Sequence, residues 1–376
     1  MMRLGSTTRS GNASDFARVA LGVYVLLIAY ASWFPFSGWR SNGLHPFDYL
    51  LAPLPHYWTG FDVATNVVGY VPVGVLGVFA FYPQLRGWSA MLLTTVGGTL
   101  LSAGMEAVQT FLPSRVASNL DLMTNAAGCL LGALLGVLLT RYFLEHSRLL
   151  RIRGRWFTHE ASRGLIVLTL WPLAQIYPQG YLFGHGQLLP IVSGWLSSLA
   201  DQPVDLAAYL RHDVELSIEQ YWLSETIITA CGLTGALLTL LCLTRDRAPK
   251  ALLALALFSI AVLVKSLASA LLFSPENAFT WLTPGARGGL VVGVIMLTGL
   301  AFAPPIAQRR VAALTLLISL AVVNAAPANP YFVSTLQAWV QGKFLNFNGA
   351  AQFLSLAWPF FTLWFLFHPV HANKRE

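Results

Sequence analysis

Long apolar runs alternate with shorter polar links along the chain, and this pattern predicts helices that cross a membrane. Ten runs come close to the roughly 20 residues that an α-helix needs to span the hydrocarbon core of a bilayer. These runs lie at residues 17–34, 61–82, 88–111, 119–140, 162–178, 223–243, 251–273, 287–304, 311–327 and 351–368. The fifth and ninth runs are the shortest. We therefore predict an all-α protein, a polytopic transmembrane helical bundle of about ten spans.

The composition agrees with this pattern and excludes the soluble classes of protein. Hydrophobic residues make up 56% of the 376 residues and charged residues only 10%, and the mean hydropathy is +0.61. The three cysteines, Cys129, Cys231 and Cys242, all fall in predicted spans, where a thiol behaves as a small apolar group. No two histidines have metal-ligand spacing within a span, so we expect no metal site and no cofactor.

Lysine and arginine are unevenly distributed over the links, which predicts the orientation of the spans. When both termini are placed in the cytoplasm, 17 of the 23 basic residues face that side. An excess of basic residues in cytoplasmic links is what the positive-inside rule expects. We therefore predict cytoplasmic termini, a cytoplasmic link at residues 141–161, and outer segments at residues 35–60 and 179–222.

The formal net charge of +7 is accordingly a feature of topology, and it favours attraction to anionic lipids of the inner leaflet. The basic residues are scattered over several links without aromatic residues between them, so we predict no nucleic-acid partner. The predicted location is the bacterial inner (cytoplasmic) membrane, with several passes. The sequence leaves the oligomeric state open.

The basic link at residues 141–161 predicts a division of the chain into two parts. Residues 1–140 hold four predicted spans, and residues 162–376 hold about six. The second part carries the outer loop at residues 179–222, in which the apolar spacing of residues 205–220 predicts a short surface helix. The first outer segment, residues 35–60, is rich in aromatic residues and prolines. It is typical of an interfacial aromatic belt, and a cover over the neighbouring polar residues is the alternative.

Charged and amide side chains gather where the third predicted span turns into the fourth. Glu106 and Gln109 are three residues apart, and Asp121 and Asn125 are four apart, so each pair shares one helix face. Pro113 ends the incoming helix, and Ser118 or Asn119 can cap the outgoing one. Two antiparallel helices with so short a link are neighbours, so we expect one polar cluster at the end of this hairpin.

Two further features of the first part bear on the hairpin. Arg115 lies in its turn, where we expect it to pair with Glu106 or Asp121. The predicted orientation brings Asn66, and Asp62 near it, to the same depth, at the outer-leaflet boundary. The fourth predicted span contains a glycine at every fourth position: Gly128, Gly132 and Gly136. Such a stripe of small residues permits close helix packing, so we predict a packing role for these glycines.

These residues resemble the signature of VanZ-like membrane proteins. The matching elements are E-x-x-Q at Glu106, P-x-R at Pro113, D-x-x-x-N-x-x-G-x-x-x-G at Asp121, and the preceding N-x-x-x-x-x-P-x-G at Asn66. The resemblance covers about residues 17–140. It implies little about chemistry, because the family is named for one member associated with resistance to a lipid-tailed glycopeptide antibiotic and a biochemical activity is not generally assigned.

We predict that the outer-facing polar cluster contacts a ligand, since charge at membrane depth is costly. The expected ligand-binding residues are Asn66, Glu106, Gln109, Arg115, Asp121 and Asn125. The expected partners are membrane lipids or lipid-tailed small molecules. A purely structural cluster is the alternative, as are an intramembrane enzyme of envelope glycan or lipid chemistry and a transporter of a lipid-linked substrate. No nucleophile motif or nucleotide loop is visible, which disfavours the enzyme.

Lys265 is a second charge at membrane depth, in the predicted span at residues 251–273. With a rise of ~1.5 Å per residue, it lies in the outer half of that span. Glu225 or Glu276 is placed to pair with it, and extension of the side chain to the interface is the alternative.

Overall fold

The computed structural model describes residues 7–34, 36, 38–41, 43, 45–145, 148–158, 161–212, 214, 216–327 and 345–368. The regular secondary structure of these residues is helical, with one isolated β-bridge between Phe157 and Thr244. The chain divides into two compact units, Met1–Gly154 and Arg155–Glu376. The terminal residues 1–6 and 369–376, whose side of the membrane the charge pattern predicts, lie outside the described residues.

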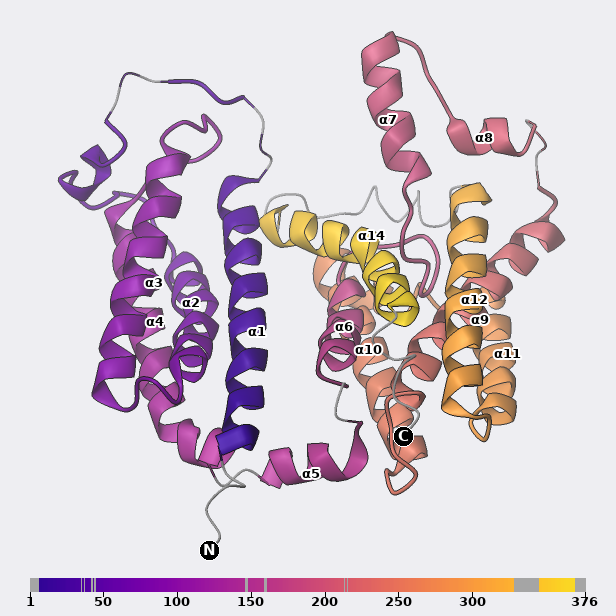
Figure 1. The fold of residues 1–376 in the computed structure, drawn as a ribbon. Coiled ribbons are helices and arrows are strands. Elements are labelled where there is room, and N and C mark those ends of the chain that lie inside the picture. The colour runs from indigo at the N-terminus through magenta and orange to yellow at the C-terminus, as the bar shows by residue number, and fades with distance from the viewer. Residues whose placement is uncertain are drawn as a thin grey trace, which may run out of the picture. The chain divides into compact units, whose positions relative to one another are not determined.

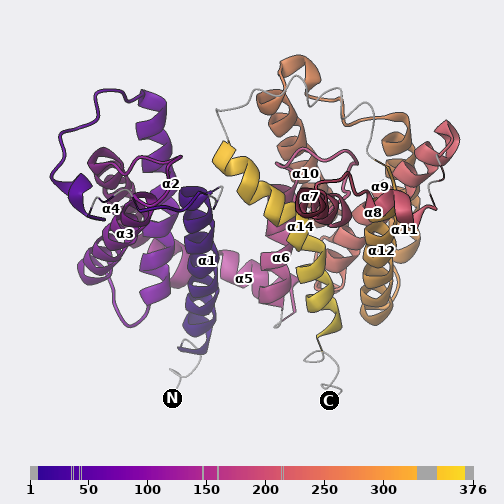
Figure 2. The ribbon, with the colours of Figure 1, turned by 90° about the horizontal axis from the view of Figure 1, so that it is seen from above.

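Four long helices form the first unit, and they lie side by side in Figures 1 and 2. They are α1 (Thr7–Trp33), α2 (Gly60–Phe81), α3 (Trp88–Gln109) and α4 (Asn119–Thr140). A 3-10 turn, η1 (Asp48–Leu50), precedes α2, and a π-helical turn, η2 (Arg141–Glu145), follows α4. The predicted cytoplasmic link then continues as α5 (Arg148–Trp156), while residues 146, 147, 159 and 160 of that link lie outside the described residues.

Local sequence explains where α2 begins and how it is held. Thr59 and Asp62 form a capping box, in which each side chain accepts a hydrogen bond from the backbone N–H of the other residue. At its far end, the Arg18 Nε of α1 donates to the carbonyl of Ala80 at 3.0 Å. The Tyr24 hydroxyl of α1 also donates to the carbonyl of Gly69 at 2.8 Å. Polar contacts to backbone carbonyls thus join α1 to α2 at two levels.

Glycines bring α2 and α4 into backbone contact. A Cβ added to Gly128 would lie 2.1 Å from the carbonyl oxygen of Val67, and one added to Gly132 would lie 2.0 Å from that of Val71. From the other side, a Cβ on Gly74 would lie 2.1 Å from the Cys129 oxygen. No side chain larger than hydrogen fits at these distances, so the predicted packing role of the glycine stripe is confirmed.

The second unit is built around α9. It contains α6 (Ala161–Ala174), α7 (Leu189–Ala200), α8 (Leu206–Leu210), α9 (Ile218–Leu241), α10 (Lys250–Leu272), η3 (Pro275–Asn277), α11 (Pro284–Leu300), α12 (Pro305–Ala325) and α14 (Leu345–Phe367). Every residue of α9 from Ile228 to Leu241 is buried. A helix that is apolar all round belongs in the core, and α11 and α12 both pack against it.

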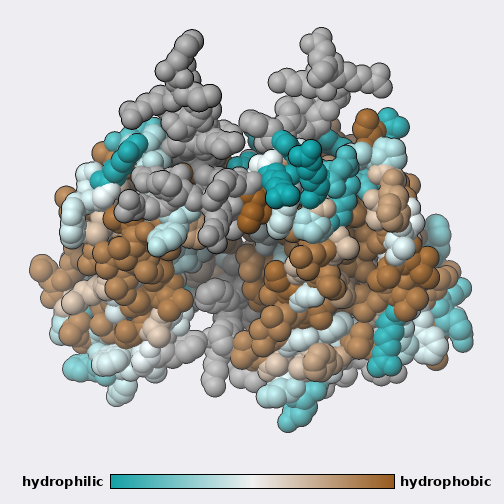
Figure 3. All heavy atoms as spheres, turned by 90° about the horizontal axis from the view of Figure 1, so that it is seen from below, coloured by the Kyte–Doolittle hydropathy of each residue, from teal (hydrophilic) through white to brown (hydrophobic). Residues whose placement is uncertain are grey.

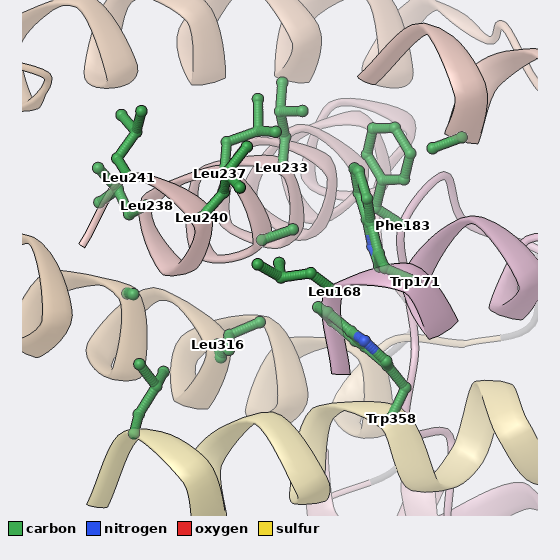
Figure 4. Packing of buried hydrophobic residues seen from close by; sticks show 14 of the residues in the cluster. Leu168, Trp171, Phe183, Leu233, Leu237, Leu238, Leu240, Leu241, Leu316 and Trp358 are labelled. Atoms are coloured by element: carbon green, nitrogen blue, oxygen red, sulfur yellow. The ribbon is translucent and has the colours of Figure 1, made fainter. Parts of the chain in front are cut away.

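Large apolar side chains fill this core, as Figure 4 shows. The Trp171 ring of α6 lies 5.0 Å from the Phe183 ring and 6.1 Å from the Trp358 ring of α14, centroid to centroid. Leu238 of α9 is fully buried among them. The second unit therefore packs through interdigitated side chains, which is how a water-excluding protein interior reaches its density.

Each of the ten predicted spans coincides with a helix of the described residues, which confirms an all-helical membrane fold. Seven helices are long and apolar enough to cross a bilayer: Phe16–Trp33, Asp62–Phe81, Trp88–Gln109, Asn119–Thr140, Ile218–Leu241, Lys250–Leu272 and Pro305–Ala325. The other three, within α6, α11 and α14, are shorter. The ninth predicted run proved longer than expected because α12 begins at Pro305. The count of about ten spans and the orientation stay predictions.

The surface of the helices is apolar, as lipid contact requires. Large hydrophobic side chains on α3, α4, α10 and α11 are more than half exposed, among them Leu100 at 67%, Leu138 at 60%, Leu263 at 58% and Ile295 at 66%. Figure 3 shows apolar residues over much of the visible face of both units. Contiguous exposed apolar surface of this kind marks an interaction with a membrane or a partner.

The predicted outer loop at residues 179–222 has two different parts. Tyr181, Leu182, Phe183 and His185 are buried inside the second unit. The remainder forms α7 and α8, and α8 is the short helix expected in residues 205–220, capped by the Asp205 carboxylate. It has five residues only, and α9 begins at Ile218.

Candidate functional site at the polar end of the first unit

The end of α3, the start of α4 and the start of α2 lie at the same end of the first unit, together with the last turn of α1 (Figure 1). Residues 110–118 connect α3 to α4 there, and residues 34–59 connect α1 to α2. Five of the six predicted site residues belong to these helix ends and to this turn. Asn125 lies one helical turn deeper along α4.

Glu106 fixes the turn that enters α4. Its side chain is only 3% exposed, and its Oε2 accepts a hydrogen bond from the backbone N–H of Ser118 at 2.9 Å. The Ser118 hydroxyl in turn accepts from the backbone N–H groups of Leu120 and Asp121 at 3.2 and 3.4 Å. Ser118 is thus the capping residue of α4, and a carboxylate on α3 holds it in place.

Asp121 and Asn66 join α4 to α2. The Asn66 Nδ2 donates to the Asp121 Oδ1 at 2.9 Å, and both side chains are half-buried. Asp62, one turn earlier on α2, is exposed and serves the capping box with Thr59. The structure therefore brings Asn66 and Asp121 together as predicted and gives Asp62 a local role.

Asn125 makes a deeper contact between α4 and α3. Its Nδ2 donates to the Ser102 hydroxyl at 2.9 Å, in a buried position. Its Oδ1 is buried without a hydrogen-bond partner in the structure. The Tyr70 hydroxyl of α2 also lies close to Ser102. Ser102 is a partner that the sequence reasoning missed, although it is four residues before Glu106 and so on the same face of α3.

Arg115 and Gln109 bind the last turn of α1. The Arg115 guanidinium donates from Nη2 to the Phe34 carbonyl at 3.0 Å and to the Ala31 carbonyl at 3.3 Å. The Gln109 Nε2 donates to the Ser32 carbonyl at 3.2 Å. A cation is favourable at a helix C-terminus, where carbonyl groups lack intrahelical partners.

The predicted ion pair of Arg115 is not a direct contact in the described part of the chain, where no salt bridge joins it to Glu106 or Asp121. Glu106 still acts on it electrostatically. Burial lowers the pKa of the Arg115 guanidinium, and the Glu106 carboxylate opposes that shift. The prediction of a pair was wrong because the carbonyls at the end of α1 compete for the guanidinium, and a hairpin motif contains no information about α1.

Residues 38–52 lie against the end of the hairpin. The Arg40 N–H donates to the Phe111 carbonyl at 3.0 Å, and the Asn119 Nδ2 donates to the Ala52 carbonyl at 2.6 Å. Tyr49 is 5% exposed, and its hydroxyl donates to the Ala103 carbonyl at 3.2 Å. Burial, with a contribution from the Glu106 charge, raises the pKa of Tyr49. This segment therefore covers part of the polar cluster, as the sequence allowed beside an interfacial aromatic belt.

The chain between this segment and α2 also keeps apolar and aromatic side chains on its surface, beginning at Leu51. Leu51 is 94% exposed, Tyr57 96% and Trp58 59%. Aromatic and apolar residues of this kind are enriched at the membrane interface, so cover and interfacial belt are compatible roles. Among the described residues, no group of three or more His, Cys, Asp or Glu side chains is arranged to hold a metal ion.

Helices of membrane-spanning length, an apolar surface and a polar cluster at one end define a multi-pass membrane protein. Within it, residues 21–140 match the model of the family described as VanZ/LLP1, so this segment of the chain is VanZ-like. The match confirms the resemblance expected for about residues 17–140, and it contains all six predicted site residues. No curated protein and no solved structure matches the chain significantly.

Proposed function

We propose that the polar cluster of the VanZ-like segment binds the head group of a membrane lipid or of a lipid-tailed compound, such as a lipoglycopeptide antibiotic. One observation carries this proposal. In the described part of the chain, neither Glu106 nor Asp121 has a cation within 4.0 Å, and each accepts one hydrogen bond from the protein. An ionised carboxylate has about four acceptor positions, so both acids retain capacity for a ligand.

This geometry favours a head group that donates hydrogen bonds. The two carboxylates suit the hydroxyl groups of a sugar or the ammonium of an amine, whereas Arg115 is engaged with the carbonyls of α1. Asn125 adds an acceptor, since its Oδ1 lacks a partner. A tail attached to such a head group would meet exposed apolar residues of α3 and α4, among them Leu100 and Leu138. These features support a ligand with a polar, donor-rich head and an apolar tail.

The competing interpretation is a cluster that only ties helices together. In that interpretation Glu106 holds Ser118, Asp121 holds Asn66, and no ligand is needed. The two interpretations differ for substitutions that keep shape and remove charge. Glu106→Gln and Asp121→Asn retain an acceptor oxygen for the protein's own hydrogen bonds, so the fold is expected to survive, while a cationic or hydroxyl-rich head group loses its strongest contact.

The test is thermal unfolding of the purified full chain in detergent, with phosphatidylethanolamine, phosphatidylcholine or a lipid-tailed glycopeptide added in separate arms. We expect one donor-bearing compound to raise the Tm of the parent, and we expect Glu106→Gln and Asp121→Asn to lose that increment. Glu276→Gln, at an exposed residue of η3, is the matched control. If both variants fold and show the same ligand-induced rise in Tm as the parent, the cluster has only a structural role.

The location proposed for this site is the outer face of the bacterial inner membrane, in the cell envelope. Impermeant thiol labelling tests that orientation in cells after the three native cysteines are replaced. A cysteine at Tyr57, which is 96% exposed, is expected to react from outside, and one at Gly154, in the predicted cytoplasmic link, is expected to react only after permeabilisation. The opposite pattern would place the cluster at the inner face and remove the association with outer-leaflet ligands.

A further inference from the structure

A buried, non-helical segment lies inside the second unit. Residues 175–188 connect α6 to α7, and most of their side chains are buried. Buried backbone groups outside helices need hydrogen-bond partners from other parts of the chain. Here other helices provide the backbone contacts. The Asn324 side chain of α12 bonds Gly186, Leu188 and Leu189, and the Gly186 N–H donates to the Ser355 carbonyl of α14 at 3.1 Å.

His185 is the centre of a polar cluster in this segment. Its Nε2 lies 2.6 Å from the Gln175 Nε2, and its Nδ1 lies 2.7 Å from the Gln179 Nε2 and 3.3 Å from the Ser355 Oγ. The Gln179 side chain also contacts the Ser355 hydroxyl. His185 is 3% exposed, Gln175 0%, Gln179 6% and Ser355 4%. Three polar side chains of the segment and one of α14 are thus enclosed together.

The hydrogen-bonding capacity of this cluster is not used up. Neither Gln175 Oε1 nor Gln179 Oε1 has a partner in the structure. A neutral imidazole donates from one ring nitrogen and accepts at the other, so one glutamine must present its carbonyl to His185 and the other its amide. The Gln175 Nε2 also donates to the Trp171 carbonyl at 3.2 Å. Gln175 therefore keeps its amide towards His185, and Gln179 presents its carbonyl. The Gln179 NH2 and the Gln175 carbonyl then remain for another group. A buried polar atom without a partner costs about 1–3 kcal/mol, which argues for a role beyond packing.

Lys265 of α10 adds a positive charge next to this cluster. It is 3% exposed and close enough to His185 to act on it electrostatically. Its neighbours along α10 face the same segment. The Phe258 ring lies 6.4 Å from the Phe183 ring, and Ala268 packs in one cluster with Ile176. Burial, and to a smaller extent the nearby lysine, both disfavour a positive charge on the imidazole of His185.

The carboxylates expected to pair with Lys265 have other positions. The Glu225 Oε2 packs against the start of α11, where it would lie 2.3 Å from a Cβ on Gly285. Glu276 is exposed and accepts a hydrogen bond from the Ser274 hydroxyl at 2.8 Å. In the described part of the chain no carboxylate lies within 4.0 Å of the Lys265 Nζ. The predicted pairs are therefore not formed, and the side chain does not extend to the interface.

We propose that Lys265, Gln175, Gln179, His185 and Ser355 form a binding site for an anionic oxygen group, a carboxylate or a phosphate. An ammonium buried without a counter-charge is strongly unfavourable, and an anion supplies that charge. The free amide NH2 and the Ser355 hydroxyl supply further donors to its oxygens, as charge-assisted hydrogen bonds. The anion can come from a soluble molecule or from a lipid head group. This site is separate from the polar cluster of the first unit and does not depend on it.

The test measures thermal unfolding of the purified full chain with three probes. Sodium phosphate and sodium acetate are added in detergent, with sodium chloride at equal ionic strength as reference. Phosphatidic acid in phosphatidylcholine nanodiscs is compared with phosphatidylcholine alone. We expect at least one anion to raise the Tm of the parent by about 2–4 °C. This is the shift that ~1 kcal/mol produces in a domain of about 150–250 residues. Phosphate or acetate identifies a soluble ligand, and phosphatidic acid identifies a lipid.

Lys265→Met separates binding from folding. Replacing a buried charge with an apolar side chain of similar length is often neutral or stabilising. We therefore expect this variant to unfold at the parent's Tm or above it without added anion, and to lose the increment. Lys250→Met, at the more exposed start of α10, is the matched control and is expected to keep it. Gln179→Leu, which retains Lys265, is expected to reduce the increment.

Two results would overturn the proposal. One is a parent whose Tm does not respond to any of the three anionic probes beyond its reference, a result that needs no variant. The other is a Lys265→Met protein that responds as the parent does. If the parent does not respond to any anion and Lys265→Met has a lower Tm than the parent, Lys265 stabilises the fold and does not bind an anion.

Discussion

The two units bury their helices by opposite means. In the first unit, α2 and α4 meet backbone to backbone, because Gly74, Gly128 and Gly132 have no side chain to hold the helices apart. In the second unit, α9 is surrounded by large side chains from α6, α10, α11 and α12. Between helices in lipid, small residues gain close van der Waals contact, whereas large residues gain packing by interdigitation. Each unit is therefore sensitive to a different kind of substitution.

Their polar groups differ in the same way. The cluster of the first unit lies at one end of the helices and is built largely from one hairpin, residues 102–125. The cluster of the second unit lies inside and draws on residues from 175 to 355. The first lies where the helices of its unit end, and the second requires that other helices close around it. One chain thus builds one polar cluster from residues that are close in sequence and another from residues that are far apart.

The largest effect is expected from removing core volume in the second unit. Leu238 is fully buried in α9, and Leu238→Ala is expected to lower the free energy of unfolding by about 2–5 kcal/mol, through lost transfer energy and a residual cavity. Thermal unfolding in detergent measures this. Leu255→Ala on α10, where the side chain is 60% exposed, is the control and should change stability far less. Equal effects at the two positions would contradict side-chain packing around α9.

A smaller loss is expected from adding volume between α2 and α4. A Cβ at residue 132 would lie 2.0 Å from the Val71 oxygen, and such overpacking costs about 1–3 kcal/mol. Gly132→Ala should therefore lower the Tm. Gly97→Ala on α3, where nothing lies within 4 Å of an added Cβ, should leave it unchanged or raise it, since alanine favours the helix. If Gly132→Ala is as stable as Gly97→Ala, the helices are not in backbone contact.

The smallest effect concerns the link between α1 and the hairpin. Arg115→Ala removes hydrogen bonds to the Ala31 and Phe34 carbonyls, and we expect a loss of about 1.5 kcal/mol, the lower range for a charged hydrogen bond, because the site is half-buried. Arg287→Ala, at an exposed residue that donates to the Leu282 carbonyl, should lose less. Combining Arg115→Ala with Glu106→Gln should show only a small coupling, because the two charges act on each other without a direct contact. A large coupling energy between the two substitutions would indicate a direct ion pair between Arg115 and Glu106.

Sequence reasoning located the helices of both units, since hydropathy and length alone predict where a chain crosses a bilayer. It also brought Glu106, Asp121 and Asn125 together, because two helices joined by a short turn must be neighbours. The orientation predicted from the basic residues placed Asn66 at the same depth. The glycine stripe was informative because its spacing is local, and only the identity of the partner helix, α2, had to come from the structure.

The contacts that the sequence could not predict join elements without a fixed separation. Arg115 binds the end of α1, and Tyr49 donates to the Ala103 carbonyl. Lys265 of α10 acts electrostatically on His185, and no salt bridge joins it to Glu225 in the described part of the chain. Periodicity states which face of a helix a residue occupies and leaves open which element covers that face. The sequence alone thus determined a helical membrane protein with a VanZ-like hairpin. Tertiary structure decided which charges meet, because burial of one helix against another depends on the packing of the whole unit.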